Sequence, residues 1–348
     1  MNRPTPPKPG AGVKVKQRPE AKTTKTFKTA TWDPSKKGKR VVLYADSGMG
    51  KTTLEALLPN PKFVNFNGGS DQIFHPVTGK PLNYIPGVET FDDVRALCRQ
   101  PDLFKPGDSF VLDTATEFEG GPILDWMLEN VPHEKGPSIP IKRVEDYGFG
   151  KGFRHLYDTA RLPLADYDFL IERGVNVVLS CPMQQVETSN SGGGDFLCDV
   201  PKLQKAHGKS TPAVWALYNE WADHILKIDY DDVNVGEGKA SGTAERVVRV
   251  HGLPHFKAKS RSIPHLFPVV SFSEPSDDSI WRFLFNEAWR ETDEWKEYQK
   301  ELGGEEDVAE VSDRGYSSGC VRCNARRLPF GRLFQSWASG SGDRIPKF

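Results

Sequence analysis

The fold is decided by the stretch Ala45-Asp46-Ser47-Gly48-Met49-Gly50-Lys51-Thr52, which separates an apolar run from a segment of helical character. The run RVVLY at 40–44 predicts a buried strand, and residues 53–58 predict a helix. In a glycine-rich turn from a strand into a helix, backbone N–H groups can curl around phosphate oxygens. This order therefore predicts a nucleoside triphosphate site, with ATP and Mg²⁺ as the expected ligands.

Each residue type in this loop has a physical role. Lys51 is expected to reach the β- and γ-phosphates, and the Thr52 hydroxyl is expected to bind Mg²⁺. The first glycine of the pattern G-x-x-x-x-G-K-[ST] is replaced by Ala45, whereas Gly48 and Gly50 still permit close approach of the backbone. The predicted nucleotide-binding residues are Ala45, Asp46, Ser47, Gly48, Met49, Gly50, Lys51, Thr52 and Thr53.

A second buried strand, SFVLD at 109–113, ends on a carboxylate. A phosphate loop needs such a group to hold Mg²⁺ through its water shell, and Asp113 is the predicted one. The alternative is a strand-end aspartate that caps the next turn. Glu117 and Glu119 lie just beyond and are candidates to orient or deprotonate the attacking water.

The pattern along the chain predicts an α/β fold. Apolar runs alternate with helical patterns, and Val175–Ser180 is apolar on both faces, as in a parallel strand covered by helices. Together with the phosphate loop, we therefore expect a P-loop NTPase core with a doubly wound, mainly parallel β-sheet covered by helices on both faces. Further expected strands lie at 62–66, 224–228 and 246–251, and a hairpin is expected at 74–85. Further expected helices are one that begins at Thr90, one that follows Gly152 and ends at Arg173, and one at 212–222.

Four regions are expected. Residues 1–38 form a basic arm with only two acidic residues, for which nucleic-acid binding and simple solubilisation are the alternatives. Residues 39–270 form the ATPase core. Residues 271–303 carry aromatic side chains at helical spacing, which predicts an amphipathic helix packed on the core. Residues 304–348 are expected to be a disordered tail.

Composition excludes several classes of protein. No apolar segment approaches the length of a membrane span, and the N-terminus lacks an apolar signal segment, so a cytoplasmic protein is expected, in the host cytoplasm if the chain is of phage origin. Five cysteines in 348 residues do not make a disulfide framework. Cys320 and Cys323 have no second pair nearby to complete a zinc site.

The order of these motifs resembles the RecA-like phage nucleotide-binding ATPases, the Sak-type group associated with single-strand annealing and recombination. The likeness covers about Arg40 to Pro268. It implies a RecA-type core that forms a ring or filament of identical subunits, with ATP held between neighbours. The segments that carry it are the phosphate loop, Leu57–Pro61, Asn67–Gly69, Asp113-Thr114, Tyr147–Gly152, Asn176–Leu179, Pro201–Leu203, Glu220–Asp223 and Ala258–Arg261.

The resemblance also implies site residues. Lys259 and Arg261 match an element that projects toward the next subunit's phosphates, where a cation offsets charge developing on the γ-phosphoryl group. The alternative for these residues and Lys257 is a solvated basic loop. Gln184 and Gln185 occupy the place of a glutamine that senses the γ-phosphate.

A long polar segment, Ser189–Thr211, exceeds the length of a simple connection. The resemblance assigns it to single-stranded DNA contact, with Lys202, Lys205 and Lys209 on phosphates and Phe196 as a stacking group.

One departure from the family pattern concerns the rate of ATP hydrolysis. Many relatives have an acidic residue where this chain has Asn67, which cannot act as a base, so hydrolysis is expected to be slow or to use Glu117.

The leading interpretation is an ATP-binding, slowly hydrolysing protein that acts on single-stranded DNA in phage-type recombination or annealing, together with a single-strand-binding protein. One alternative is a nucleotide-dependent assembly or switch ATPase that acts on a protein partner. Another is a ring helicase or packaging motor. The basic arm and the lysine-bearing segment favour DNA, whereas the net charge of −1 does not.

Overall fold

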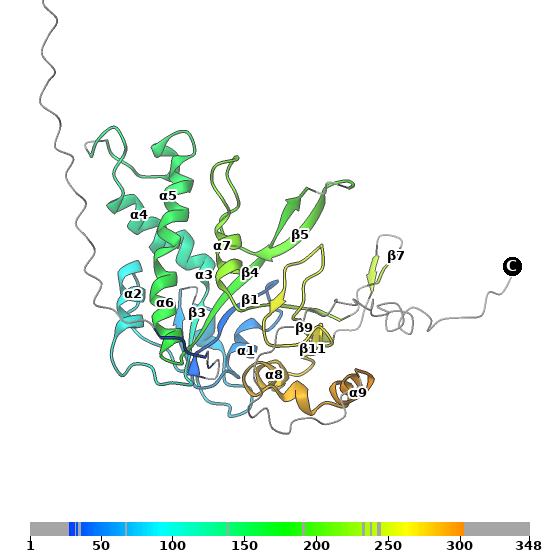
Figure 1. Cartoon of the computed structure of the whole chain (residues 1–348). Helices are drawn as coiled ribbons and strands as arrows, with labels where there is room; N and C mark the ends of the chain where they lie inside the picture. The colour runs from blue at the N-terminus through cyan, green and yellow to red at the C-terminus, as the bar shows by residue number, and fades with distance from the viewer. Residues whose placement is uncertain are drawn as a thin grey trace, which may run out of the picture. The chain divides into compact units, whose positions relative to one another are not determined.

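The computed structural model describes residues 28–31, 33, 36–66, 68–137, 139–189, 192–231, 234–236, 239–241 and 245–302, shown in colour in Figure 1. Most of the expected basic arm lies outside these ranges. The expected tail at 304–348, with Cys320 and Cys323, lies wholly outside them, as does Asn67. The chain divides into two compact units, 1–295 and 296–348. Among the described helices, none is long and apolar enough to cross a bilayer.

Helices and strands alternate along the described chain. The first half contains β1 (Arg40–Ala45), α1 (Lys51–Glu55), β2 (Pro61–Asn65), η2 (Ser70–Gln72), α2 (Phe91–Arg99), β3 (Ser109–Asp113), α3 (Ala115–Phe118), η3 (Glu119–Ile123), α4 (Leu124–Asn130), η4 (Val144–Tyr147), α5 (Lys151–Ala160) and α6 (Leu162–Glu172). The second half contains β4 (Asn176–Thr188), β5 (Phe196–Pro201), α7 (Val214–Trp221), β6 (His224–Tyr230), β7 (Asn234–Gly236), β8 (Lys239–Ser241), β9 (Arg246–Arg249), β10 (Lys259–Ser260), β11 (Val269–Ser271), α8 (Ser279–Asn286), η5 (Ala288–Glu291) and α9 (Asp293–Glu301).

The main sheet has nine strands within the described ranges, in the order β11-β9-β6-β1-β4-β3-β2, with β10 also paired to β6 and β5 to β4. The five strands from β6 to β2 are parallel, whereas β5, β9, β10 and β11 join antiparallel. The predicted fold class, a mainly parallel α/β sheet of the P-loop type, is confirmed. β4 lies between β1 and β3, so the strand before the phosphate loop and the strand ending at Asp113 are not direct neighbours.

The central strand β1 is buried on both faces. Val41 and Leu43 belong to one hydrophobic cluster, Val42 and Tyr44 to the other, and all four are fully buried. Successive side chains of a strand point to opposite faces, so this run serves both layers. Each fully buried side chain of this kind contributes roughly 1.5–3 kcal/mol of transfer free energy.

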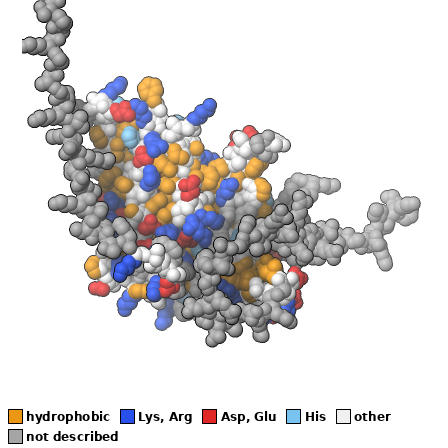
Figure 2. All heavy atoms as spheres, in the orientation of Figure 1, with side chains coloured by type: hydrophobic (Ala, Val, Ile, Leu, Met, Phe, Trp, Pro, Cys, Tyr) orange, Lys and Arg blue, Asp and Glu red, His pale blue; other side chains and the backbone are white. Residues whose placement is uncertain are grey.

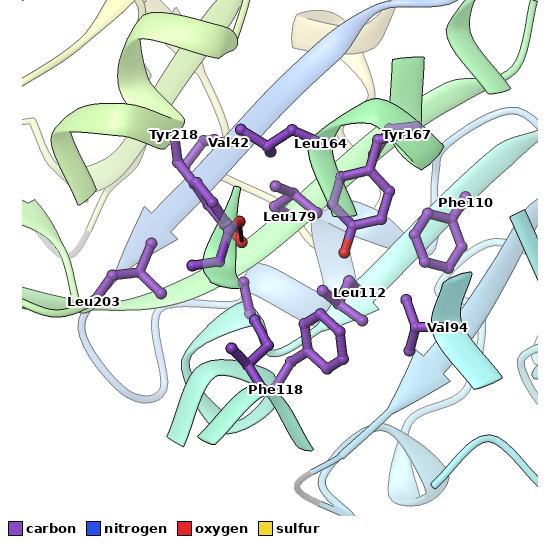
Figure 3. Close-up of a cluster of buried hydrophobic side chains, with 14 of the residues drawn as sticks. Val42, Val94, Phe110, Leu112, Phe118, Leu164, Tyr167, Leu179, Leu203 and Tyr218 are labelled. Carbon is purple, nitrogen blue, oxygen red and sulfur yellow. Dashed lines mark hydrogen bonds between the residues drawn. The ribbon is translucent and has the colours of Figure 1, made fainter. Parts of the chain in front are cut away.

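Helices cover both faces of the sheet, as predicted. Helices α2, α3, α5, α6 and α7 contribute to the first cluster, and α1 and α8 to the second. Figure 3 shows the first cluster, in which Tyr167 of α6 and Tyr218 of α7 lie close to Leu179 of the sheet. On the other face, the Trp281 Nε1 donates to the Leu54 carbonyl at 2.7 Å. This contact joins α8 to the helix that follows the phosphate loop.

Two local predictions in the first half are confirmed. Thr90 caps α2 by accepting the Asp93 N–H, and the Asp93 carboxylate accepts the Thr90 N–H in return. In the expected hairpin at 74–85, Phe74 and Pro81 form an antiparallel bridge. Both features arise from residues close together in the chain, which is why the sequence pattern predicts them.

The prediction of one aromatic helix over 271–303 is wrong. The segment consists of α8, the 3-10 turn η5 and α9, with the break at Glu287, whose φ of 52° lies in the left-handed region. Trp281 and Trp289 are buried in the second cluster, as expected for a stripe that packs on the core. Within the described part of α9, no side chain is buried.

The polar segment 189–211, expected to be a functional or mobile loop, contains the strand β5 at Phe196–Pro201. β4 extends to Thr188, well past the expected end at Ser180, and residues 183–188 pair antiparallel with β5. This outer part of β4 is half-exposed, so its polar side chains conceal the alternation of a strand. As a result, Gln184 and Gln185 lie on a strand and not in a loop.

Candidate nucleotide site

The phosphate loop follows β1 directly and leads into α1. Gly48 and Gly50 have φ values of 79° and 89°, in the left-handed region that side chains disfavour. A Cβ at Gly50 would also lie 2.6 Å from the Arg246 Nη1 and 3.2 Å from the Phe272 ring. Backbone conformation therefore favours glycine at position 50, and a side chain there would also displace the Arg246 guanidinium, whereas Ala45 is accommodated as the last residue of a regular strand.

Lys51 folds back over this loop. Its Nζ donates to the carbonyls of Ala45 at 3.1 Å and Asp46 at 3.0 Å. Burial lowers the pKa of Lys51, an effect opposed by the nearby Glu55 and Asp113 carboxylates. The ammonium is thus held beside the backbone amides that would face a phosphate, and its donors can exchange these carbonyls for phosphate oxygens.

Three oxygen-bearing side chains meet beside Lys51. The Thr52 Oγ1 and the Ser70 Oγ each donate to the Asp113 Oδ2 at 3.1 Å. Asp113 is buried; burial raises the pKa of its carboxyl, and the two hydroxyl groups and Lys51 lower it. Hydroxyl and carboxylate oxygens are the ligands that Mg²⁺ prefers, so this group fits that ion.

The sequence-predicted residues Lys51, Thr52 and Asp113 are therefore brought together by the fold. Ser70 was missed. It follows Gly68 and Gly69, but nothing in the local pattern shows that the 3-10 turn η2 places its hydroxyl on Asp113.

Glu55 is a further residue that the sequence does not single out. It lies one helical turn after Lys51 and is fully buried. Burial raises the pKa of Glu55 well above its usual range and the neighbouring Asp113 adds to the increase, whereas the Ser180 hydroxyl and Lys51 oppose it. A buried carboxyl group therefore lies behind the phosphate loop, close to both Lys51 and Asp113.

The two glutamates that follow Asp113 differ in their surroundings. Glu117 is exposed on α3, where its N–H donates to the Thr114 Oγ1 at 3.2 Å. Glu119 is buried, and its carboxylate accepts the Gln204 N–H at 2.9 Å. Burial raises the pKa of Glu119 to about 8, with the Gln204 N–H lowering it. The structure thus gives Glu119 a role in anchoring the segment after β5 and leaves Glu117 as the accessible candidate.

Gln184 is engaged within the β4–β5 hairpin. Its Nε2 donates to the carbonyls of Pro201 at 3.1 Å and Leu203 at 2.6 Å. A role in sensing the γ-phosphate stays a prediction, and in this structure the amide group fixes the base of the hairpin. On the same strand, the Gln185 Nε2 donates to the Asp199 Oδ1 at 3.1 Å.

The lysine-bearing segment lies close to the chain that follows Asp113. Lys202, Lys205 and Lys209 are all exposed. The Thr116 Oγ1 donates to the Lys202 carbonyl at 2.5 Å, and the Lys205 Nζ donates to the Gln185 carbonyl at 2.9 Å. One face of this segment is therefore anchored to α3 and β4 while its lysines are accessible. Phe196, the expected stacking residue, is half-buried.

Lys259 and Arg261 do not approach their own phosphate loop. Lys259 pairs with Ile225 near the amino end of β6, and Arg261 forms an ion pair with Asp223 at 3.0 Å. The phosphate loop follows the opposite, carboxyl end of the parallel strands. The rise along the six-residue β1 alone separates these ends by about 17 Å.

A buried charge network that the sequence analysis missed joins the hairpin to the sheet. Lys227 of β6 is 4% exposed and donates to the Asp199 Oδ2 at 2.7 Å and the Asp229 Oδ2 at 2.8 Å. Arg249 also pairs with Asp229, at 3.0 Å. Lys227 is in register with Tyr44, next to the start of the phosphate loop. The only signal in the sequence is a lysine within the apolar strand HILKIDY.

Comparison with known proteins adds to this geometry. Residues 37–262 match a family model described as an AAA domain, a range that contains every predicted site residue. No curated protein sequence matches the chain. Among solved structures, the KaiC-like protein PH0186 from the hyperthermophilic archaeon Pyrococcus horikoshii OT3 is similar, with 11% sequence identity and a TM-score of 0.33 over 68% of this chain and 90% of that one.

Proposed function

Because the chain belongs to the AAA domain family, whose model matches residues 37–262, we propose that it binds ATP with Mg²⁺ and hydrolyses it slowly. We further propose that it acts on single-stranded DNA in recombination or annealing of the phage Sak type. The observation that carries the nucleotide part is the contact of Thr52 with Asp113 beside Lys51.

Each part of the site has a function in binding. The amides of the loop and the Lys51 ammonium would hold the β- and γ-phosphates. Thr52 would hold Mg²⁺ directly, and Asp113 through the ion's water shell. When bound, the ion neutralises charge on the phosphate oxygens. Arg246, whose Nη1 donates to the Met49 carbonyl at 3.3 Å, supports the loop from the sheet.

The arrangement supports binding more strongly than turnover. The carboxylate of Glu119 is occupied by the Gln204 N–H, so Glu117 is the remaining carboxylate close behind Asp113 that can reach water. An exposed glutamate without positioning contacts is a weak general base. Slow hydrolysis is the consequence.

Two features support the action on single-stranded DNA. Exposed lysines at 202, 205 and 209 form a basic segment suited to the phosphates of a flexible strand. The segment is joined to α3 by the contacts of Thr116 with Lys202 and of Glu119 with Gln204. Since α3 begins two residues after Asp113, a shift of Asp113 on nucleotide binding would move α3, and α3 would move the lysine-bearing segment through these contacts.

The placement of Lys259 and Arg261 supports a ring or filament of identical subunits. These cations lie near the amino ends of the parallel strands, whereas their own phosphate loop follows the carboxyl end of β1. A neighbouring subunit could bring its ATP to them there. The Arg261 side chain is 60% exposed, although it is paired with Asp223. In that assembly the cations would stabilise charge in the transition state of hydrolysis.

Calorimetric titration with ATP and Mg²⁺ tests the nucleotide assignment. Lys51→Ala removes charge-assisted hydrogen bonds to the phosphates and should weaken binding at least roughly 10-fold. Lys80→Ala, which removes an exposed lysine outside the loop, should leave the affinity unchanged. Equal affinities of the wild type and Lys51→Ala would refute the assignment.

The DNA assignment is tested by fluorescence anisotropy of a labelled single-stranded oligonucleotide, with and without ATP and Mg²⁺, over a range of salt concentrations. Binding that weakens with salt and depends on the nucleotide is expected. If the protein binds ATP but no oligonucleotide at low salt, the DNA proposal fails, and a switch ATPase acting on a protein partner becomes the better interpretation.

A further inference from the structure

The aromatic ring of Phe149 is fully exposed to solvent. Its exposed fraction is 101%, the highest among the large apolar side chains that the structure describes. An aromatic ring gains free energy when it is removed from water. The residue also has a φ of 49°, a backbone conformation that is strained for an aromatic residue. Neither local packing nor backbone preference accounts for a phenylalanine here.

The backbone of the loop around Phe149 packs tightly against neighbouring residues. Gly148 and Gly150 have φ values of 71° and 72°, so three consecutive residues have a positive φ. A Cβ at Gly150 would lie 2.6 Å from the His207 ring, and one at Gly152 would lie 2.1 Å from the Val144 carbonyl oxygen. The backbone is therefore pressed against its neighbours while the side chain of Phe149 projects away from them.

This loop contacts the lysine-bearing segment directly. The rings of His207 and Phe153 stack with centroids 4.2 Å apart, and the Gln204 Nε2 donates to the Phe153 carbonyl at 3.1 Å. In Figure 1, the start of α5 and the loop before α7 lie at the same end of the structure. The two segments meet where Gly150 lies against His207. Phe149 precedes Gly150 in the chain, and the exposed Lys205 and Lys209 stand two residues to either side of His207.

The lysine-bearing segment brings cations to this surface, because Lys205 and Lys209 are exposed and no acidic residue lies between positions 202 and 211. Figure 2 shows Lys and Arg side chains projecting beside hydrophobic ones at this end of the structure. Near Phe149 the charges are mixed: Glu134 pairs with Lys151, Asp146 accepts the N–H groups of Lys142 and Arg143, and Glu145 is exposed.

We propose that Phe149 stacks on an unpaired base of a single-stranded nucleic acid whose phosphates contact Lys205 and Lys209. This inference rests on the proposed DNA-binding function and adds a base-contacting residue to it. The exposed Phe149 ring offers a single flat face, whereas a protein partner would require an apolar groove. The base of a single strand can stack on such a face. In a duplex both faces of each base are already covered by neighbours, so the ring selects single strands.

The test compares two strands of equal length and charge, an oligo-thymidine and an abasic deoxyribose-phosphate strand, by fluorescence anisotropy. The wild type should bind the strand with bases more tightly. Phe149→Ala should lose roughly 5- to 150-fold on oligo-thymidine, the range of a stacked base, and almost nothing on the abasic strand. Phe149→Trp should restore the preference, and Phe169→Ala, which removes a ring that is 45% exposed on α6, should not alter it.

The outcomes separate this inference from the function on which it rests. If the wild type binds single strands and Phe149→Ala keeps the full preference for bases, the stacking assignment is overturned while the DNA proposal stands. Equal losses on both strands, or an altered sedimentation coefficient with an unchanged preference, would also overturn it and indicate a structural role or a subunit contact. If the wild type binds no strand, both proposals fall.

Discussion

Lys51 and Arg261 lie at opposite ends of strand β1 in the same chain. Lys51 follows the loop that begins where β1 ends, whereas Arg261 pairs with Asp223, whose N–H donates to the Arg40 carbonyl at the start of β1. A single subunit therefore cannot bring this guanidinium to its own nucleotide without taking the sheet apart. Any action of Arg261 on ATP must occur between subunits.

Arg261→Ala should lower ATP turnover much more than ATP affinity, by roughly 10³-fold if the guanidinium acts as an arginine finger. Mixed with Lys51→Ala, it should regain part of the hydrolysis, because some interfaces then combine an intact loop with an intact arginine. A phosphate-release assay measures this, with Arg282→Ala as a control at an exposed, ion-paired arginine. A mixture that stays inactive, although the two variants co-assemble, would show that Arg261 is only a solvated cation.

Asp113→Asn should retain nucleotide binding in the absence of metal and lose most of the gain on adding Mg²⁺. An asparagine can still accept the Thr52 hydroxyl, but it lacks the charge that orients the ion's water shell. Loss of such an outer partner typically lowers metal affinity by roughly 10- to 100-fold. Titration of Mg²⁺ at constant ATP measures the effect, with the exposed Asp125→Asn as control. If the Mg²⁺ titrations of the wild type and Asp113→Asn agree, Asp113 does not support the ion and is only a strand-end residue that caps the next turn.

Replacing Lys202, Lys205 and Lys209 together with alanine should weaken binding to single-stranded DNA and flatten its dependence on salt. The logarithmic slope should fall by about 0.7 for each phosphate contact that is lost. Replacement of Lys80 and Lys105, two exposed lysines outside the segment, is the control. If the slopes of the wild type and the triple variant agree, the DNA surface lies elsewhere, and the basic arm at 1–38 is the next region to test.

Lys227→Met should destabilise the fold by at most about 3–5 kcal/mol, because it removes the buried cation shared by Asp199 and Asp229, whose side chains are only 13% and 28% exposed. Urea unfolding measures the free energy. Arg282→Met, which breaks an exposed ion pair, should cost less than about 1 kcal/mol. A similarly small cost for Lys227→Met would mean that water screens the network.

Glu119 should make stability depend on pH. Its folded-state pKa of about 8 lies above its ordinary value of 4.5, so the native state binds this proton more tightly than the unfolded chain does. The stabilisation is fully present below the ordinary pKa and is lost as the pH rises through about 8. Unfolding free energies measured between about pH 6 and about pH 9 should therefore fall, and Glu119→Gln should show a smaller fall. An unchanged profile in the variant would assign the dependence to other groups.

Elements with local signals could be predicted from the sequence. The apolar run Val41–Tyr44 predicts a buried strand, and the run at 175–180 predicts one buried on both faces, because neighbouring residues of a strand point to opposite sides. The glycines and Lys51-Thr52 predict a phosphate loop, because backbone conformation and side-chain chemistry at that turn depend on adjacent residues. Asp113 at a strand end follows from the same kind of local pattern.

Which distant residues meet became clear from the three-dimensional arrangement alone. The insertion of β4 between β1 and β3, and the turn that carries Ser70, place two hydroxyl groups on one Asp113 oxygen. The parallel register of β1 and β6 places Arg261 away from Lys51. Packing of Gly150 against His207 brings the loop of Phe149 against the lysine-bearing segment. Strand order, register and close packing arise from contacts between segments far apart in the chain, and such contacts leave no period or motif in the sequence.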